Sequence, residues 1–192
     1  MAYLSQEKLE AMGFKSLGKN VQVSDRAAIH NADQIELGDY ARIDDFCVVS
    51  GRVAMGRYTF LGVHCNVAGG STGVFMDDFS AVAYGVHLLA QSDDYQGLGM
   101  AGPRIPLRFR RETRKPVRLE PYSLVALNSV ILPGVTLAEG SSVLAMSLVT
   151  KSTQPWSVYF GVPAKRLKSR KKDLLEHAKR FLEEEAAARV VS

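Results

Sequence analysis

The strongest pattern in the chain is a repeat of six residues between positions 119 and 154. Each unit opens with an aliphatic residue: Leu119, Val125, Ile131, Leu137, Val143 and Val149. The fifth position is small, hydroxylated or β-branched: Ser123, Ser129, Val135, Ser141, Ser147 and Thr153. A period of six fits neither an α-helix nor a long two-residue alternation. Because repeats of this kind are typical of solenoids, we predict a parallel β-helix in which three short strands make one coil of about 18 residues.

The same pattern extends back to Leu17, with interruptions at 29–34 and at Gly51. A glycine-rich stretch at 69–73 predicts a short flexible insertion. From 90 to 116 the repeat disappears, and prolines and arginines take its place. Long segments without a repeat inside a compact domain are usually functional or disordered. We therefore predict a loop that protrudes from the coil and can reach a neighbouring subunit.

Helices are predicted at both ends of the chain. Ser5 is a plausible N-cap and Gly13 a stop, which predicts a short helix over 5–12 that covers the open end of the solenoid. An apolar stripe predicts a second helix over about 171–189, packed along the outside of the coil. The predicted divisions are an N-terminal cap (1–16), the β-helix with its loop insertion (17–165) and a C-terminal helix (166–192).

Composition adds little beyond an ordinary globular protein, with 46% apolar and 23% charged residues. The first residues lack the apolar core of a signal peptide, and no apolar run is long enough to span a membrane. Cys47 and Cys65 are 18 residues apart and would stack on adjacent coils. A disulfide is conceivable there, but buried free thiols in the cytoplasm are the favoured interpretation.

Positive charge is concentrated in two stretches, with seven of the 24 Lys and Arg at 104–118 and eight at 165–180. Basic clusters often face nucleic acid. Here there is little interleaved aromatic surface and no nucleic-acid-binding motif, so no nucleic-acid partner is expected. A small polyphosphate ligand or a solvated face explains the charge.

The repeat, the closing Val149-Thr150-Lys151 and the segment Gly161-Val162-Pro163-Ala164-Lys165 resemble the left-handed β-helix (hexapeptide-repeat) acyltransferases. The chain is most similar to galactoside and maltose O-acetyltransferases and to sugar acetyltransferases of O-antigen and capsule clusters, a motif of which resembles the segment at 92–97. The resemblance implies a left-handed coil and a homotrimer with active sites between subunits. It also implies acetyl-coenzyme A as co-substrate and no metal.

The resemblance also indicates a coenzyme A site. It places Thr150 and Lys151 near the nucleotide end, Pro163 on the adenine and Lys165 on a phosphate. Phosphates need positive charge, which these lysines supply. An oxyanion could be stabilised by a backbone N–H at a coil corner, with Ala126 or Ala145 as candidates.

Transfer to a sugar hydroxyl needs a general base, usually a histidine. Relatives carry this histidine at the start of the loop, where the present chain has Asp93 or Asp94. His87, just before the loop, could act as the base with Asp94 as its orienting carboxylate. His64 is a further candidate at a corner, where a surface or interface role is equally open. The two aspartates could instead serve only as turn residues.

These features predict an acyl-CoA-dependent acyltransferase that acts on a sugar hydroxyl or amine, on a precursor of O-antigen, capsule or lipopolysaccharide. A non-catalytic β-helix scaffold is one alternative. A zinc enzyme of the γ-carbonic anhydrase type is another, but it needs three converging histidines, and His64 and His87 are 23 residues apart at different repeat positions.

Overall fold

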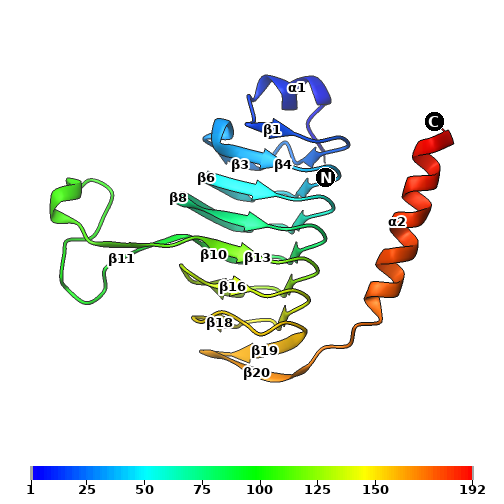
Figure 1. Ribbon diagram of the computed structural model, residues 1–192. Coiled ribbons are helices and arrows are strands. Elements are labelled where there is room, and N and C mark those ends of the chain that lie inside the picture. The colour runs from blue at the N-terminus through cyan, green and yellow to red at the C-terminus, as the bar shows by residue number, and fades with distance from the viewer. Residues whose placement is uncertain (1, 192) are drawn as a thin grey trace.

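The computed structural model describes residues 2–191 and shows a three-sided parallel β-helix, with its coils stacked from the N-terminal to the C-terminal end (Figure 1). The first face is an eight-stranded sheet of β2 (Gln22–Val23), β5 (Arg42–Ile43), β7 (Phe60–Leu61), β9 (Ala81–Val82), β14 (Leu124–Val125), β17 (Ser142–Val143), β19 (Ser157–Gly161) and β20 (Ala164–Ser169). Residues 1 and 192 of the predicted end segments lie outside the described residues.

The second and third faces share two strands that run around a corner, β6 (Val48–Met55) and β8 (Asn66–Met76). The second face adds β3 (Ala28–His30), β10 (His87–Leu89), β15 (Val130–Ile131) and β18 (Leu148–Val149). The third face adds β1 (Ser16–Leu17), β4 (Ile35–Leu37), β13 (Val117–Leu119) and β16 (Thr136–Leu137). A 3-10 turn, η1 (Ala32–Gln34), lies between β3 and β4.

The aliphatic repeat residues fill the prism, as predicted. All six between Leu119 and Val149 are at most 1% exposed. Of the small residues, Ser147 stacks over Ser129, to whose Oγ its N–H donates at 3.2 Å, and the Thr153 Oγ1 donates to the Ser141 Oγ of another corner at 3.0 Å. Cys47 and Cys65 are both buried free thiols, which agrees with the favoured interpretation.

The long loop interrupts the sequence repeat but not the stacking of the coils. On the first face, Val82 pairs with Val125, although the loop separates them in sequence. On the second face, Leu88 pairs with Ile131 in the same parallel register. Residues 90–116 are therefore an insertion at one corner, which we call the loop corner, where the preceding coil turns through residues 69–73.

The glycine-rich stretch at 69–73 is not the flexible insertion that its composition predicted. It lies inside β8, where Gly70 pairs with Gly51 of β6 across a register shift. Gly51 and Gly70 have φ of +72° and +52°, and a Cβ on Gly51 would come within 2.6 Å of the Gly70 backbone nitrogen. Glycine is required here because two coil backbones touch at a sharp bend.

A second corner, here called the aromatic corner, carries a stack of rings from Tyr40, Tyr58, Phe79 and Tyr122. Neighbouring ring centroids are 4.7–5.4 Å apart and the rings are nearly parallel. These four residues have φ near +60°, a conformation that is uncommon for residues other than glycine. Ring stacking and the N–H bond of each corner to the preceding coil, such as Tyr58 to Asp39 O at 2.9 Å, offset that strain.

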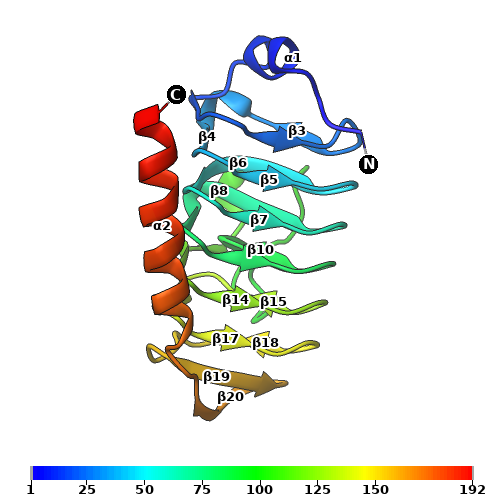
Figure 2. The ribbon, with the colours of Figure 1, turned by 90° about the vertical axis from the view of Figure 1, so that its right-hand side faces the viewer.

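The helices lie as predicted, with one shift in position. Helix α1 (Gln6–Ala11) begins at the N-cap Ser5 and buries Leu9 at the open end of the prism. Helix α2 (Leu174–Val191) runs back along the prism (Figure 2), and Phe181 meets Tyr58 edge-on at 5.1 Å. It begins at Leu174, slightly later than the predicted 171. Residues 164–169, part of which the predicted division assigned to the C-terminal helix (166–192), form β20, an antiparallel strand on β19.

No helix in residues 2–191 is long and apolar enough to cross a bilayer.

Candidate functional site

The inserted segment leaves the loop corner as a two-stranded ribbon that projects far from the prism (Figure 1). Strand β11 (Gln91–Asp93) pairs antiparallel with β12 (Glu112–Arg114), and a 3-10 turn, η2 (Leu107–Phe109), lies near the tip. The pairs are Gln91 with Arg114, Ser92 with Thr113, and Asp93 with Glu112. Opposed residues of an antiparallel pair point to the same side. The ribbon therefore has one strongly charged face and one mainly hydroxylated face.

The charged face closes a cavity of about 320 Å³, which we call the ribbon cavity. It is lined by Leu89, Gln91, Ser92, Asp93, Tyr95, Pro103, Arg110 and Glu112. Glu112, with a side chain only 13% exposed, accepts from the Arg110 Nη1 at 2.8 Å and from the Arg114 Nε at 2.7 Å. Two arginines thus neutralise one buried carboxylate.

Asp93 is left without a cation of its own. It stands directly opposite Glu112, yet its carboxylate makes no hydrogen bond or ion pair with any described residue. Like charges placed opposite each other in a sheet are destabilising. A ligand that brings a positive or hydrogen-donating group to Asp93 would relieve this arrangement.

A second cavity, of about 270 Å³, lies against the hydroxylated face and is called here the prism cavity. It is lined by Ser92, Asp93, Asp94, Tyr95, Gln96, Thr113, Leu132, Pro133 and Thr150. Asp93 lines both cavities, so it stands where they adjoin. The structure thus brings together three residues that the sequence singled out: Asp93, Asp94 and Thr150.

Asp94 holds the loop in its conformation. Its carboxylate accepts from the backbone N–H groups of Gln96 at 3.0 Å, Leu98 at 2.6 Å and Gly99 at 3.1 Å. The hydrogen bond from Gln96 leads the effects that lower the pKa of Asp94, with the Leu98 and Gly99 bonds and the charge of Arg111 acting in the same direction. A carboxylate held in this way is a weak base, which favours the turn role over proton abstraction.

We expect Asp94→Ala to loosen the loop while leaving the prism intact. The amides of Gln96, Leu98 and Gly99 should exchange with solvent about tenfold faster or more at neutral pH, because each loses a charged acceptor. Folding lowers the pKa of Asp94, so this stabilisation is present above the ordinary carboxyl range and is lost as the pH falls through the lowered value. In the unmodified chain these amides should therefore remain protected at about pH 5 and lose protection only in stronger acid. Equal exchange rates in the variant and the parent would contradict the assignment.

The two histidine candidates lie outside both cavities. His87 is exposed at the start of β10, and no hydrogen bond joins it to Asp94 in the described part of the chain. His64 lies at the third corner, called here the outer corner, where its ring stacks on Phe46 at 4.9 Å. The roles of both histidines stay predictions.

The residues expected to hold coenzyme A lie at the C-terminal end of the prism. Thr150 and Lys151 follow β18 and are exposed, as are Pro163 and Lys165 in and after the turn between β19 and β20. That turn is anchored where the Gly161 N–H donates to the Ser147 Oγ at 3.1 Å. Because Ser147 comes just before β18 and Thr150 just after it, the turn and Thr150 lie at opposite ends of β18.

The two oxyanion candidates differ in what their N–H groups do. The Ala126 N–H donates to Val143 O at 2.8 Å within the coil ladder. The Ala145 N–H makes no hydrogen bond with any described residue. Of the two, Ala145 is the one with a donor to offer.

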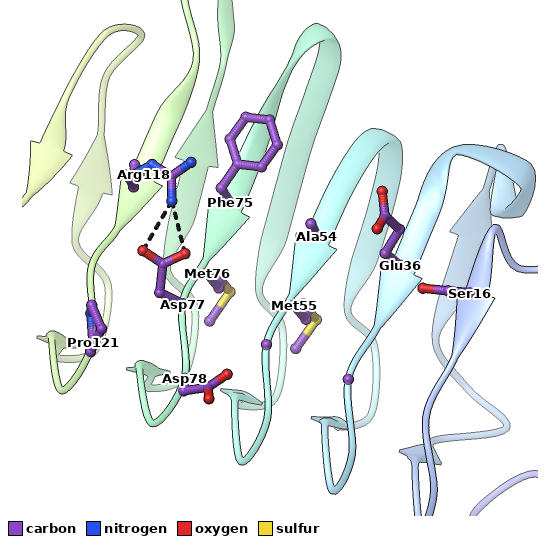
Figure 3. A pocket seen from close by; sticks show the side chains of 12 residues that line it. Ser16, Glu36, Ala54, Met55, Phe75, Met76, Asp77, Asp78, Arg118 and Pro121 are labelled. Atoms are coloured by element: carbon purple, nitrogen blue, oxygen red, sulfur yellow. Dashed lines mark hydrogen bonds and ion pairs between the residues drawn. The ribbon is translucent and has the colours of Figure 1, made fainter.

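A third cavity, of about 460 Å³, is a groove on the third face, away from the ribbon (Figure 3). Its three carboxylates already have cationic partners. Arg118 donates to both Asp77 oxygens at 2.8 and 3.0 Å, the Arg57 Nε to Asp78 at 2.9 Å, and Lys15 to Glu36 at 2.6 Å. The groove therefore lacks the unpaired charge that distinguishes Asp93.

The Arg110–Glu112–Arg114 network was not singled out from the sequence, although the alternation of charges at every second residue is the signal that a strand would give. Within residues 2–191, no three His, Cys, Asp or Glu side chains are grouped so as to hold a metal ion.

Comparison with known proteins agrees with this description. No family model matches the chain. It is 34% identical to dTDP-4-amino-4,6-dideoxy-D-glucose acyltransferase of Escherichia coli over 92% of this chain and 93% of the relative. The structure of AntD, an N-acyltransferase from Bacillus cereus in complex with dTDP and 3-hydroxybutyryl-CoA, is 36% identical and covers 96% of this chain and 98% of its own, with a TM-score of 0.94.

A maltose O-acetyltransferase from Clostridium difficile shares the fold, at 18% identity and a TM-score of 0.56, with 87% of this chain and 75% of its own covered. The level of identity to the Escherichia coli enzyme over nearly the whole chain excludes a scaffold of unrelated function. The chain belongs to the sugar acyltransferases of the hexapeptide-repeat, parallel β-helix type, and it is an acyltransferase.

Proposed function

We propose that this enzyme transfers an acyl group from acyl-coenzyme A to the amino group of a dTDP-linked 4-amino-4,6-dideoxy sugar. The relatives support the substrate class. The Escherichia coli relative is named for the acylation of dTDP-4-amino-4,6-dideoxy-D-glucose, and a variant of AntD was solved with that sugar nucleotide and coenzyme A.

The unpaired Asp93 carboxylate is the observation that carries the choice of an amine. It faces Glu112 and lines both cavities, with no cation of its own among the described residues. An amine, neutral or protonated, can donate hydrogen bonds to this carboxylate, and in its charged form it also offsets the repulsion from Glu112. A hydroxyl acceptor would need a general base, and neither cavity contains a histidine.

In the proposed reaction the amine nitrogen attacks the thioester carbonyl carbon. A C–N bond forms, the C–S bond breaks, and one amine proton reaches the departing sulfur directly or by way of Asp93. The products are the amide and coenzyme A thiol. Asp93 orients the lone pair of the nitrogen and holds the proton in transit, which is positioning together with general-base assistance.

We place the acyl donor at the C-terminal end of the prism. The thioester would approach Asp93 through the prism cavity, which Thr150 lines. The exposed Lys151 and Lys165 offer positive charge to the phosphates, with Pro163 against the adenine. The Ala145 N–H, next to Met146 at the outer corner, would serve an oxyanion at a site that a neighbouring copy completes. Acetyl-coenzyme A is our proposed donor.

We also propose a homotrimer. The outer corner carries a line of exposed apolar side chains: Phe46 at 47%, Tyr84 at 60%, Leu127 at 46% and Met146 at 63% exposure. A row of this kind marks an association surface, and a cyclic arrangement of identical prisms would bury it. The ribbon projects beyond its own prism, so a neighbouring copy can complete the site. We place the trimer in the cytoplasm, in the supply of sugars for surface polysaccharides.

The test is an acceptor comparison with the purified protein and acetyl-coenzyme A. We expect thiol release and an N-acylated product with dTDP-4-amino-4,6-dideoxyglucose. The matched acceptor with a hydroxyl in place of the amine should react at least about 100-fold less efficiently, because it lacks the group that Asp93 binds. A mass spectrum before and after mild base separates amide from ester. Equal turnover of the two acceptors, or acylation of the hydroxyl acceptor alone, would overturn the proposal.

A further inference from the structure

One donor of a side chain that lines the ribbon cavity has no acceptor among the described residues. The Nε of Arg110 is fully buried and makes no hydrogen bond with the described residues, although Nη1 of the same guanidinium bonds to Glu112 at 2.8 Å. A buried donor without a partner is destabilising, and most such groups in folded proteins are satisfied by protein, water or ligand. The guanidinium is held in the loop because Nη1 also donates to Gly102 O at 3.5 Å and the side chain is only 15% exposed.

The lining of the ribbon cavity has the chemistry of a sugar site. Asp93 and Glu112 offer acceptors, Arg110 offers a donor, and Gln91 and Ser92 offer both. Tyr95, 89% exposed overall, adds a ring at the rim for the apolar face of a sugar. The lining holds two carboxylates and one guanidinium, and this net negative charge suits an amino sugar better than a free phosphate.

We propose that Arg110 determines acceptor specificity by donating its Nε–H to the sugar hydroxyl next to the reacting amine. The inference rests on the proposed function, because it assumes that the amine binds at Asp93. Asp93 and Arg110 line the same cavity, so neighbouring substituents of one ring can engage both. In a 4-amino-4,6-dideoxyhexose only C3 offers such a hydroxyl, since C5 carries the ring oxygen and the methyl group.

The arrangement also explains why Glu112 has two arginine partners. Arg114 can neutralise Glu112 from its own side, through Nε at 2.7 Å and Nη2 at 2.5 Å. Glu112 in turn accepts from Nη1 of Arg110 and thereby holds the guanidinium in the wall of the cavity. Arg110 is therefore a substrate-reading residue held in place by Glu112, whereas Arg114 serves to balance the charge of Glu112.

Arg110→Lys tests this assignment, because lysine retains a cation for Glu112 but has no Nε–H at that position. We expect kcat/KM for the hydroxylated amino sugar to fall about 10- to 100-fold, the effect of one hydrogen bond from a charged donor. Arg114→Lys is the matched control, since it weakens the same ion-pair network outside the cavity. We expect it to alter kcat/KM by less than about threefold. Melting temperatures of both variants show whether a loss of folding contributes.

A second acceptor that lacks only the hydroxyl next to the amine completes a double-mutant cycle between the enzyme and the substrate. The unmodified enzyme should lose about the same factor on this acceptor, and Arg110→Lys should lose nothing further. The inference would be overturned if Arg110→Lys changed kcat/KM no more than Arg114→Lys does, or if it lowered kcat/KM equally for both acceptors. Acylation of the amino sugar by the parent enzyme would still support the proposed function in either case. If the parent fails to acylate either amino sugar, the proposed function itself has failed.

Discussion

Asp93→Asn should lower kcat/KM for the amino sugar by about 100-fold or more, with little change in melting temperature. The substitution preserves the shape of the side chain but removes the charge that attracts the amine and the site that takes up its proton. Stability should be unchanged or slightly improved, because the replaced carboxylate faces Glu112 and has no partner of its own in the described structure. Thiol release at varied acceptor concentration measures the effect.

Asp77→Asn is the control for this variant. Asp77 is also a partly exposed aspartate, but it is bonded to Arg118 in the groove of the third face. We expect its loss to leave turnover unchanged and to reduce stability by no more than about 1 kcal/mol. If Asp93→Asn retained activity within a factor of three, Asp93 would have no role in binding or activating the amine.

Replacement of the whole inserted segment, residues 90–116, should abolish catalysis and leave folding intact. Residues 90–116 occupy the loop corner of one coil, where the preceding coil turns through residues 69–73. Replacing 90–116 by a copy of Gly-Gly-Ser-Thr-Gly should produce a prism that still folds, because Val82 to Val125 and Leu88 to Ile131 are already in register. We expect acyl transfer to fall by at least about 1,000-fold, because Asp93, Arg110 and both cavities are removed together.

Circular dichroism and thermal unfolding check the first part of this expectation, and thiol release checks the second. The melting temperature should change by only a few degrees, since loop length affects stability weakly. Coenzyme A binding, followed by calorimetry, should persist because Lys151 and Lys165 remain. A grafted protein that failed to fold would show that the ribbon is part of the stack, and one that retained turnover would place the reaction elsewhere.

The prism could be predicted from the sequence because its cause is local. An aliphatic residue at every sixth position can be buried only inside the prism, and all six between Leu119 and Val149 are buried as expected. The same reasoning identified the loop by the absence of the pattern. It failed at residues 69–73, where glycines that suggested flexibility instead allow two coils to touch.

The site could be predicted only in part. Asp93 and Asp94 were found because they replace an expected histidine, but their different environments depend on contacts that the repeat does not encode. The Asp94 carboxylate accepts hydrogen bonds from three backbone N–H groups, whereas Asp93 faces Glu112 across the ribbon. The six-residue repeat does not extend into the ribbon, so it could not predict which residues of β11 and β12 pair. The C-terminal helix segment was assigned from 166 onwards for a similar reason, because the charged run at 165–168 indicates a solvated segment until β19 is present to pair with it.

The antiparallel course of β20 limits how long the solenoid can grow. A parallel coil ends in an open row of backbone donors and acceptors, on which another chain could continue the stack as a fibre. β20 reverses direction and covers the last strand of the first face, and it presents the exposed cations Lys165, Arg166 and Lys168 at the new edge. Like charges on two such edges repel, so the C-terminal edges of two prisms should not pair with each other. The same short strand that is proposed to offer charge to a nucleotide therefore also covers the C-terminal edge of the first face.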